Sequence, residues 1–581
     1  MFKALTPFQR FMRMLSLDRK EITYVYLYAI FSGFITLSIP IGVQAIIGLI
    51  VGGSLSAAVI LLISMVTIGT LLAGVLKIMQ LTITENIQRS LFSRSSFEFA
   101  WRLPRISYEQ LLDAYAPELV NRFFDTLTLQ KGIPKLLTDT STAVLQIFFG
   151  LLLLSFYHPT FVAFSLALVL GLIAIFYFTG PRGLQTSLKE SKHKYKVAYW
   201  LEEIGRAVTT FKLSGQASLP LNRTRTLVDG YLDSRAAHFR ILLWQYGAIV
   251  VFQTLTTLAL LYLGAWLVIN NLITIGQFVA AEIVIIQILT SSEKLIFSME
   301  TIYDSLTAVE KIGYVTDMQL EREGEGVCFD QLDEGPGMSV SLRHLSFSFP
   351  DSDRKVINDL SLEVKAGERI CLIGPNRSGK STLIQMVGLL YCDFEGTISY
   401  NGISSRDIDT QDLRRHVGDY LRDEDLFQAS ILDNLWLLPE PPDMRAIRKL
   451  CDGLGVGDFV ARQPAGYHTM VTPGGRNLPA SVRTKLLLAR SLMGNPRLLA
   501  LSDFGSSLAP FDRRMIGKFL TPEKRTYTLI AISNDPFFAQ RCDRILYLDE
   551  GKLIIDAPYE EAILNERVRI SLGISEEVIT P

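Results

Sequence analysis

A glycine-rich segment that follows an apolar run has the residue types needed to bind phosphate. It runs from Gly374 to Thr382 and matches the spacing G-x-x-x-x-G-K-[ST]. In such a loop the backbone N–H groups point inward at the phosphates, and the N-terminus of the following helix adds its positive end. Lys380 is expected to reach the outer phosphates, and Ser381 is expected to hold Mg²⁺.

Every residue of this loop is a predicted nucleotide-binding residue. The loop lies between the apolar run Ile370–Ile373 and a helical pattern from Leu383 to Leu390, which is the context that the motif requires, so a chance match on a glycine turn is the weaker interpretation. Arg377 is unusual, because many such loops have glycine at that position. The predicted binding residues are Gly374, Pro375, Asn376, Arg377, Ser378, Gly379, Lys380, Ser381 and Thr382.

The composition indicates a membrane protein with several domains. The chain has 581 residues, of which 49% are hydrophobic, and its mean hydropathy of +0.27 is high for a soluble protein of this size. A net charge of −1 gives no indication of nucleic-acid binding. The 5 cysteines lack C-x-x-C spacing and none precedes Cys328, so we expect reduced thiols rather than disulfides or a zinc site. We expect no cleavable signal peptide.

Residues 1–20 predict an amphipathic helix that lies in the membrane surface. Phe8, Phe11 and Leu15 recur at helical spacing, with Arg10 and Arg13 among them. A short soluble helix is the alternative, and the apolar sequence that follows favours the membrane.

Three stretches without Asp, Glu, Lys or Arg predict six membrane spans within residues 21–316. They are Ile22–Leu76, Thr140–Pro181 and Ile241–Ala281. Each is long enough for two helices of about 20 residues, so each is expected to form a helical hairpin across the bilayer.

The distribution of basic residues predicts the orientation of these hairpins. The turns at Gly53, His158 and Asn271 lie in stretches without Lys or Arg, whereas the two long segments between hairpins contain many. By the positive-inside rule the N-terminus, both long segments and the C-terminal half face the cytosol. Each long segment has few helix breakers, so it is expected to continue as helices below the membrane.

Glu282 is a carboxylate inside the sixth predicted span. An ionisable residue at this depth usually faces a cavity or a partner. It marks either a substrate pathway or a pocket satisfied by a neighbouring helix, and the sequence favours neither.

The second half of the chain changes to a soluble α/β pattern. Residues 317–337 are polar and acidic and predict a linker, and residues 338–581 predict a nucleotide-binding domain. Arg369–Ile373, Arg497–Leu501 and Thr528–Ile532 have the apolar pattern of buried strands. Strands that alternate with helices predict a mostly parallel sheet with its ligand at the strand ends.

The order of these parts resembles one half-transporter of the ATP-binding cassette (ABC) exporter family over nearly the whole chain. Leu345–Pro350 resembles the first strand of the cassette, with Phe349 where an aromatic ring stacks on adenine. Gly418–Asn434 resembles the Q-loop segment, Gly474–Leu478 the approach to the signature motif, and Asp543–Lys552 the last strand and turn.

Within the family, the two long cytosolic segments are most similar to those of peptide and protein exporters of the bacteriocin and haemolysin type. The similarity lies in Leu103-Pro104, Leu119–Phe123 and Glu203–Lys212. It implies a type I exporter fold: an all-α membrane domain of six helices with long cytosolic extensions, followed by an α/β P-loop domain. It also implies ATP and Mg²⁺, a homodimer or a heterodimer with another half-transporter, contact with the lipid bilayer, a possible periplasmic adaptor and a bacterial inner membrane.

The sequence departs from the family where ATP is hydrolysed. The signature, LSGGQ in the family, is Leu478–Val482 here, and it would cap the nucleotide of the opposite subunit. The resemblance places Ser502 where an aspartate positions magnesium, and Asp503 in place of the catalytic glutamate. Asn534 stands in place of the switch histidine, and it cannot carry a positive charge.

Two further departures concern the Q-loop and the loop that crosses to the partner. Arg422 stands where the family has glutamine, and Ala509 replaces the last aspartate of the crossing loop. A one-residue slip would make Asp503 the magnesium residue. Ser506–Ala509 matches the crossing loop without that slip, so the register with Ser502 and Asp503 is preferred.

The residues that bind nucleotide are retained and most of those that turn it over are changed. This pattern predicts a dimeric exporter subunit that binds ATP and hydrolyses it slowly or not at all. One alternative is a non-transporting structural or regulatory membrane protein that uses the cassette as a docking or nucleotide-sensing platform. Another is an active homodimeric ATPase exporter. Whether the chain is an enzyme stays open at this point.

Overall fold

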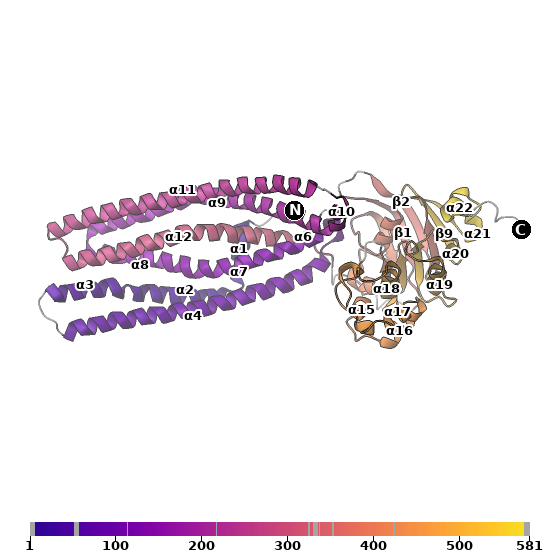
Figure 1. Ribbon diagram of the computed structural model, residues 1–581, viewed down its shortest axis with the longest axis horizontal. Helices are drawn as coiled ribbons and strands as arrows, with labels where there is room; N and C mark the ends of the chain where they lie inside the picture. Colours follow the sequence, from indigo (N-terminus) through magenta and orange to yellow (C-terminus); the bar gives the residue numbers. More distant parts are fainter. Residues whose placement is uncertain are drawn as a thin grey trace. The chain divides into compact units, whose positions relative to one another are not determined.

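The computed structural model describes residues 6–51, 57–112, 114–215, 218–322, 326–328, 335, 337–350, 352, 354–421 and 425–574. The chain folds into two compact units (Figure 1). The helical unit contains Met1–Arg105 and Ala114–Met318, and the cassette unit contains Ile106–Asp113 and Gln319–Pro581.

The helical unit contains six helical segments that are long and apolar enough to cross a membrane, counted over the described residues. This confirms the predicted spans. The first and third spans are built from shorter consecutive helices, the second is α4 extended by the short helix η1, and the other three are single helices. The helices of the unit are α1 (Pro7–Ser16), α2 (Arg19–Thr36), α3 (Ser38–Val51), α4 (Ala57–Arg102), η1 (Leu103–Arg105), α6 (Ala116–Asn121), η2 (Arg122–Phe124), α7 (Asp125–Lys135), η3 (Leu136–Thr140), α8 (Ser141–Tyr157), α9 (Pro159–Arg206), α10 (Val208–Leu213), α11 (Leu219–Ile269) and α12 (Ile275–Thr316).

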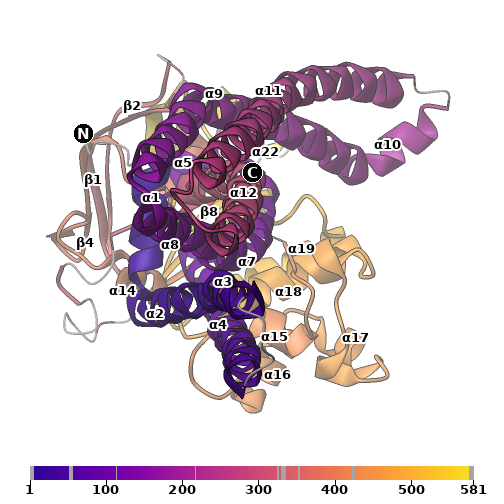
Figure 2. The same cartoon turned by 90° about the vertical axis from the view of Figure 1, so that its left-hand side faces the viewer.

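The long helices exceed what a bilayer requires. Helix α4 has 46 residues, which correspond to roughly 70 Å at about 1.5 Å per residue. A bilayer core of about 30 Å accounts for less than half of that length, so the helix continues well beyond the membrane. Helices α9 and α11 lie side by side (Figure 2). The short helix α10 lies between the end of α9 and the start of α11 in the sequence.

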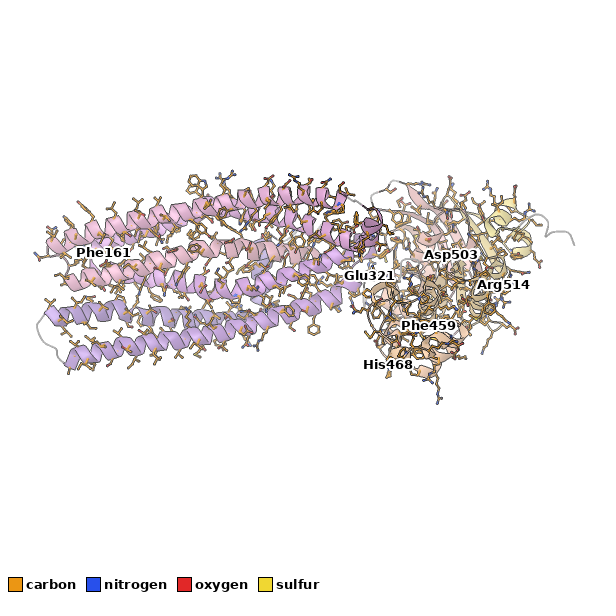
Figure 3. The ribbon with its side chains drawn as sticks, viewed as in Figure 1. Phe161, Glu321, Phe459, His468, Asp503 and Arg514 are labelled. Carbon is orange, nitrogen blue, oxygen red and sulfur yellow. The ribbon has the colours of Figure 1, made fainter. Side chains whose placement is uncertain are left out.

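The turns between spans lie where the sequence predicts them, in the part of the chain that the structure describes. Helix α8 ends at Tyr157 and α9 begins at Pro159, with His158 as its N-cap. Phe161 in the first turn of α9 is fully buried (Figure 3). Helix α11 ends at Ile269 and α12 begins at Ile275. The predicted turn at Gly53 lies outside the described residues.

Helix α12 is the central element of the helical unit. It contacts α1, α3, α7, α8, α9 and α11. Small residues such as Ala280, Ala281, Ser291 and Ser292 are buried along it, and small residues allow helices in a membrane to approach closely. Glu282 lies on this helix and is partly exposed.

The amphipathic helix α1 is fastened to the C-terminal end of α12 by ion pairs. The guanidinium of Arg10 lies 2.5 Å from a carboxylate oxygen of Glu310 and 2.6 Å from one of Asp317. The Arg10 side chain is only 12% exposed, so solvent screens these pairs less than it screens surface pairs. The N-terminal helix is therefore held against the bundle in one place.

The third span changes its helical register near the middle of its length. Pro134 lies inside α7 and lacks the N–H that would continue the hydrogen-bond ladder. One π-helical turn, η3, follows, and α8 then continues the span. The Thr138 hydroxyl donates to the Pro134 carbonyl at 2.8 Å. Single π turns of this kind often lie at functional sites.

The cassette unit contains the predicted mostly parallel sheet. Its order is β10-β9-β3-β8-β7-β6, and all neighbours are parallel except β9 and β10. A second, antiparallel sheet has the order β2-β1-β4-β5. The strands are β1 (Val340–Ser348), β2 (Lys355–Val364), β3 (Arg369–Ile373), β4 (Glu395–Tyr400), β5 (Ile403–Ser404), β6 (Val417–Tyr420), β7 (Leu498–Leu501), β8 (Thr528–Ile532), β9 (Arg544–Asp549) and β10 (Lys552–Ala557).

Helices cover the parallel sheet, and its central strands are buried. All residues of β7 and β8 are buried, as expected for strands enclosed on both faces. The helices of this unit are α5 (Tyr108–Leu112), α13 (Lys380–Val387), α14 (Thr410–Arg415), α15 (Ile431–Leu435), α16 (Met444–Gly453), α17 (Gly457–Ala461), η5 (Gly466–His468), η6 (Pro473–Gly475), α18 (Ala480–Leu492), α19 (Pro510–Leu520), α20 (Pro536–Ala539), α21 (Tyr559–Ala562) and α22 (Glu566–Leu572).

A short segment of the first long cytosolic excursion belongs to the cassette unit. A carboxylate oxygen of Glu109 accepts hydrogen bonds from the backbone N–H groups of Cys392 and Asp393, at 2.5 and 3.3 Å. The ring of Tyr108 lies edge-on to Tyr391, with centroids 5.4 Å apart. These contacts attach helix α5 to the cassette.

The predicted linker also contributes residues to the cassette unit. Glu321, labelled in Figure 3, forms an ion pair of 2.5 Å with Arg414. The backbone of Val327 is hydrogen-bonded to that of Asp407 at 2.8 Å. The described part of the linker is therefore attached to the cassette by side-chain and backbone contacts.

The cysteine content allows a direct test of the predicted orientation. All cysteines lie at or after Cys328 in the cassette half, so a cysteine introduced into the membrane half is the only one there. Asn270→Cys is preferred to a change at Asn271, which has a φ of +57°. We expect this cysteine to react with an impermeant thiol reagent in intact cells. Ser218→Cys, at the start of α11, is the control and should react only after the membrane is opened. The opposite labelling pattern would overturn the orientation.

Candidate nucleotide site

The glycine loop connects the carboxyl end of β3 to the N-terminus of α13, as predicted. Gly374 has a φ of +145°, and a Cβ built on it would lie 2.1 Å from the carbonyl oxygen of Leu548. Gly379 has a φ of +99°, and its Cβ would lie 2.8 Å from the carbonyl oxygen of Val356. Both glycines are therefore required by the close approach of neighbouring backbone as well as by their own conformation.

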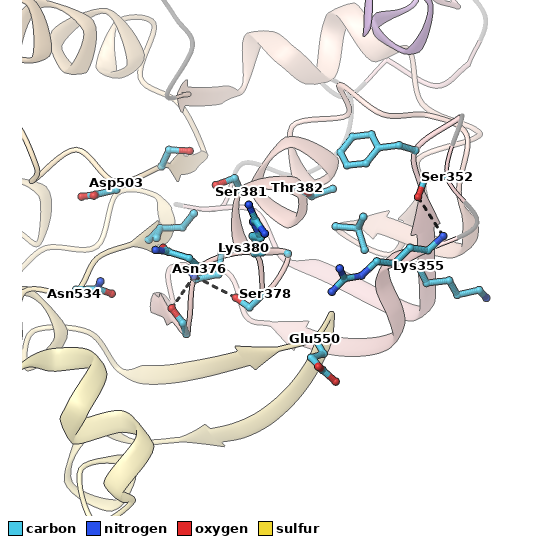
Figure 4. Close-up of a pocket in the computed structure, with 18 residues that line it drawn as sticks. Ser352, Lys355, Asn376, Ser378, Lys380, Ser381, Thr382, Asp503, Asn534 and Glu550 are labelled. Carbon is cyan, nitrogen blue, oxygen red and sulfur yellow. Dashed lines mark hydrogen bonds between the residues drawn. The ribbon is translucent and has the colours of Figure 1, made fainter. Parts of the chain in front are cut away.

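The loop folds around the ammonium group of Lys380. Its Nζ donates hydrogen bonds to the carbonyl oxygen of Gly374 at 2.8 Å and to the Ser378 hydroxyl at 3.2 Å (Figure 4). It also donates to the carbonyl oxygen of Pro375 at 2.6 Å. Burial lowers the pKa of this ammonium group below its ordinary value. Phosphate oxygens that enter the loop can replace these neutral acceptors and stabilise the charged form.

Arg377 adopts a left-handed backbone conformation, with a φ of +66°. This explains why many such loops have glycine there. For a residue with a Cβ, the left-handed conformation costs about 1–2 kcal/mol. The side chain is exposed and lies at the edge of the pocket, so no buried contact of the side chain offsets this cost.

A single pocket of about 670 Å³ brings together residues from three strand ends and the adenine side of the cassette. The loop contributes Gly374 and Asn376–Thr382, the segment after β7 contributes Ser502 and Asp503, and the segment after β8 contributes Asn534. Phe349 also lines the pocket. In Figure 4, Asp503 and Asn534 lie on one side of Lys380, and Ser352 and Lys355 lie on the other.

Two residues that follow β7 occupy the side of the pocket where magnesium and water chemistry are expected. Ser502 is 3% exposed, and its N–H donates to the carbonyl of Tyr420 at 2.8 Å. Asp503 is exposed, and its carboxylate accepts a hydrogen bond of 3.1 Å from the N–H of Gly505. Asp503 is labelled in the cassette in Figure 3. A serine hydroxyl is a weaker ligand for a hard cation than a carboxylate.

Phe349 lies in a group of aromatic rings at the other side of the pocket. Its ring is edge-on to Phe347 and Tyr391, with centroids 5.3 and 5.9 Å apart. Tyr391 also contacts Tyr108 of α5. Phe349 is only partly buried, which leaves part of its ring available to a base.

The sequence did not identify several residues that line this pocket. They come from the turn before β2 and the first residues of β2, from the end of β8 and from the turn between β9 and β10. The polar stretch after Pro350 and the Asp549–Gly551 turn can be recognised in the sequence. The sequence does not indicate that either of them lies beside the glycine loop in the folded protein. These lining residues are Ser352, Arg354, Lys355, Val356, Ile532 and Glu550.

Two predicted site residues that the structure describes, Pro375 and Glu282, do not line this pocket, and a third lies outside the described residues. Pro375 takes part through its carbonyl, which accepts from Lys380, rather than as a lining residue. Arg422 lies outside the described residues. Glu282 lies on α12 of the helical unit and makes no hydrogen bond or ion pair with any residue that the structure describes.

The altered signature segment begins helix α18 and lies outside the pocket. Pro479 is the N-cap of this helix, and proline offers no side-chain acceptor for the first free N–H groups. Leu478 and Val482 are each 8% exposed and pack into the core of the cassette. The start of this helix therefore presents no side-chain hydrogen-bonding group at Pro479 or Val482.

The loop that crosses to the partner in the family, Ser506–Ala509, also lacks a side-chain cap at the start of α19. Ala509 is the N-cap of this helix, where an aspartate would accept a hydrogen bond from the first turn. Replacing such a cap by alanine typically costs about 1 kcal/mol. Thr484 of α18 and Ser507 hold the loop nearby through a hydroxyl pair at 2.6 Å.

The strain at Arg377 gives a prediction about the loop. Arg377→Gly should raise the free energy of unfolding by about 1 kcal/mol, because glycine adopts this φ without a Cβ clash. Arg377→Ala is the matched control and should give no such gain, since it removes the same side chain but keeps the Cβ. Chemical unfolding of the protein without nucleotide measures both. Equal changes in the free energy of unfolding of the two variants would contradict the claim that the backbone at Arg377 is strained.

Two family descriptions match this chain, one in each half. The ABC transporter transmembrane region matches residues 22–292, and the ABC transporter domain matches residues 357–503. The first range contains most of the six-helix unit, and the second begins in β2 and ends at Asp503, so it contains the glycine loop.

Curated relatives match at moderate identity. The chain is 25% identical over 320 residues to the lactococcin-G-processing and transport ATP-binding protein of Lactococcus lactis subsp. lactis, which covers 55% of this chain and 45% of the relative. It is 25% identical over 365 residues to the alpha-hemolysin translocation ATP-binding protein of Escherichia coli O157:H7, which covers 63% of this chain and 51% of the relative. The chain thus spans about half the length of the curated relatives it matches.

A solved structure has the same fold. It is the structure of a bacterial Atm1-family ABC exporter with ATP bound, with a TM-score of 0.84, 20% identity and coverage of 96% of this chain and 99% of that one. Together, the two matched regions, their order and this fold show that the chain is a multi-pass integral membrane protein of the ABC transporter family, with the architecture of an exporter half-transporter.

Proposed function

We propose that this protein is a dimeric ABC exporter subunit that binds ATP and hydrolyses it slowly or not at all. The observation that carries the proposal is one pocket in which the phosphate-binding loop is complete while the residues around it are changed. Peptide or protein export from the cytosol across a bacterial inner membrane is the preferred activity. The names of the bacteriocin and haemolysin relatives support this preference.

The binding half of the proposal depends on the backbone. The N–H groups of the loop and the start of α13 supply most of the contacts to phosphate, and these contacts do not depend on the side chains at Ser502 or Asn534. Lys380 adds the positive charge, and Phe349 offers a ring face to adenine. The pocket volume of about 670 Å³ lies in the ordinary range for a small-molecule site, roughly 300–1,000 Å³.

Magnesium fits this pocket less well than the nucleotide does. The Ser381 hydroxyl can bind the ion, which would screen the charge of the phosphates. Ser502 offers a second hydroxyl instead of a carboxylate. Among the described residues there is no group of three or more His, Cys, Asp or Glu side chains that could hold a metal ion. The ion would therefore depend mainly on Ser381 and on the phosphates themselves.

The hydrolysis half of the proposal depends on side chains that are changed. Asp503 is one methylene shorter than glutamate, and a general base contributes roughly 10²–10⁴-fold only when it reaches its water. Asn534 can donate a hydrogen bond to phosphate but carries no charge. The segment Leu478–Val482 would serve the nucleotide of a partner subunit, and it has no side-chain donor at Pro479 or Val482. Both composite sites of a dimer that contains this chain would therefore be weakened.

The weakening of hydrolysis at both composite ATP sites favours one second candidate for the function. A cassette that binds nucleotide without turnover can act as a docking or nucleotide-sensing platform in a membrane protein that transports nothing. The Glu282 carboxylate favours export instead, because it has no hydrogen-bond or ion-pair partner among the described residues and is available to a substrate or to a partner chain.

Binding and turnover of ATP give the main prediction. We expect the full-length protein in lipid nanodiscs to bind labelled ATP in the micromolar to millimolar range, roughly −8 to −4 kcal/mol. Phosphate release should stay far below the usual range of roughly 1–10³ s⁻¹. Lys380→Ala should abolish binding, whereas Lys518→Ala, which removes an exposed lysine of α19, should not.

Two outcomes would contradict this account in different ways. Turnover of several ATP per second that disappears in Lys380→Ala would show an active ATPase. Absence of ATP binding by the folded wild-type protein would show that the loop no longer functions and would favour a purely structural role. Where a partner half-transporter exists, the ATP-binding and phosphate-release measurements are repeated in its presence.

Glu282 gives a separate prediction about export. If it faces the substrate pathway, Glu282→Gln should change export without lowering the thermal unfolding temperature. The reason is that no described residue depends on its charge. Glu85→Gln, which removes an exposed carboxylate paired with Arg89, is the control and should leave export unchanged. A loss of stability in Glu282→Gln with normal export would identify a structural partner instead.

A further inference from the structure

The helical unit contains a cavity of about 760 Å³ that is separate from the nucleotide site. Its wall is almost entirely apolar and comes from α1, α2, α7, η3, α8 and α12. Ile133, Leu137 and Leu306 are buried and form its inner wall, while Phe8 and Met12 of α1 are exposed at its edge. An apolar space of this kind in a membrane domain is suited to hydrocarbon.

The depth of the cavity corresponds to one leaflet of a bilayer. Along α2 the lining residues extend from Arg19 to Ile30. Eleven helical steps at about 1.5 Å each give roughly 16 Å. Half of a hydrocarbon core of about 30 Å is roughly 15 Å. Arg19 lies at the end that the positive-inside rule places in the cytosol.

Two of the polar side chains in the wall, Arg19 and Thr140, are suited to a lipid headgroup and its ester region. The Arg19 side chain is exposed and makes no hydrogen bond or ion pair with any described residue. The Thr140 hydroxyl oxygen is buried and is also without a partner in the described chain. The π turn η3 shifts the register of the helix here, and Thr140 is its last residue. A guanidinium binds phosphate, and a hydroxyl can donate to an ester carbonyl.

The outer wall of the cavity is held in place independently of any lipid. Arg10 fastens α1 to Glu310 of α12 and to Asp317, the C-cap residue of that helix. This anchors the apolar face of α1, with Phe11 and Leu15, over the cavity. The helix therefore serves as a fixed wall between the bundle and the membrane surface.

We propose that this cavity binds one acyl chain of an anionic phospholipid from the cytosolic leaflet, with the lipid phosphate on Arg19. The site is independent of ATP binding and of export. It gives the chain a specific lipid ligand in addition to the general contact of its helices with the bilayer.

Lipid retention tests the headgroup part of this proposal. Wild-type protein and variants are reconstituted in phosphatidylethanolamine nanodiscs with and without phosphatidylglycerol, and native mass spectrometry counts the phospholipids that stay bound. Arg19→Gln should lower retained phosphatidylglycerol about tenfold, the effect of one hydrogen bond between charged groups. Lys20→Gln removes the same charge one residue away, on a side chain that does not line the cavity, and should change retention little.

A second pair of variants tests the acyl-chain part. Val144→Phe fills part of the cavity and should lower the retention of phospholipid. Val162→Phe adds the same ring to an equally exposed valine of α9 that does not line the cavity, and should not. Equal retention in Arg19→Gln and Lys20→Gln, or in the two phenylalanine variants, would overturn the proposal. So would retention of phosphatidylethanolamine with no preference for phosphatidylglycerol in the wild type.

Discussion

The nucleotide pocket depends on the parallel alignment of β3, β8 and β7. Parallel strands that are adjacent in a sheet end at the same edge, so the residues after each strand must meet there. The glycine loop follows β3, Asn534 follows β8 by two residues, and Ser502 and Asp503 follow β7. Because the strands are buried on both faces, this alignment is fixed by the core of the cassette and is not sensitive to changes at the pocket surface.

That constraint separates binding from hydrolysis. The loop binds phosphate with backbone groups whose positions are set by Gly374, Gly379 and the sheet, and these survive substitution elsewhere. In the function proposed above, hydrolysis depends on side-chain reach and charge at Ser502, Asp503 and Asn534, and a side chain can change without moving the strand that precedes it. A cassette can therefore lose turnover while its fold and its phosphate site are preserved.

The sequence was most informative where a pattern is continuous along the chain. Uncharged stretches predicted the six spans, and the strand–loop–helix context predicted the position of Lys380. It was least informative where distant segments meet, as with Lys355 in the pocket and Glu109 on the cassette, because nothing in the local sequence encodes these contacts. The π turn near Thr140 follows a proline, but its register depends on the packing of the bundle.

The fate of bound ATP in a single turnover tests the central claim most directly. Labelled ATP is bound to an excess of the full-length protein without Mg²⁺, Mg²⁺ is added, and the nucleotide is recovered after increasing times. If the pocket binds without efficient hydrolysis, the label stays in ATP over minutes. Conversion of the bound ATP to ADP within about a second, the timescale of an ordinary enzyme, would contradict the account.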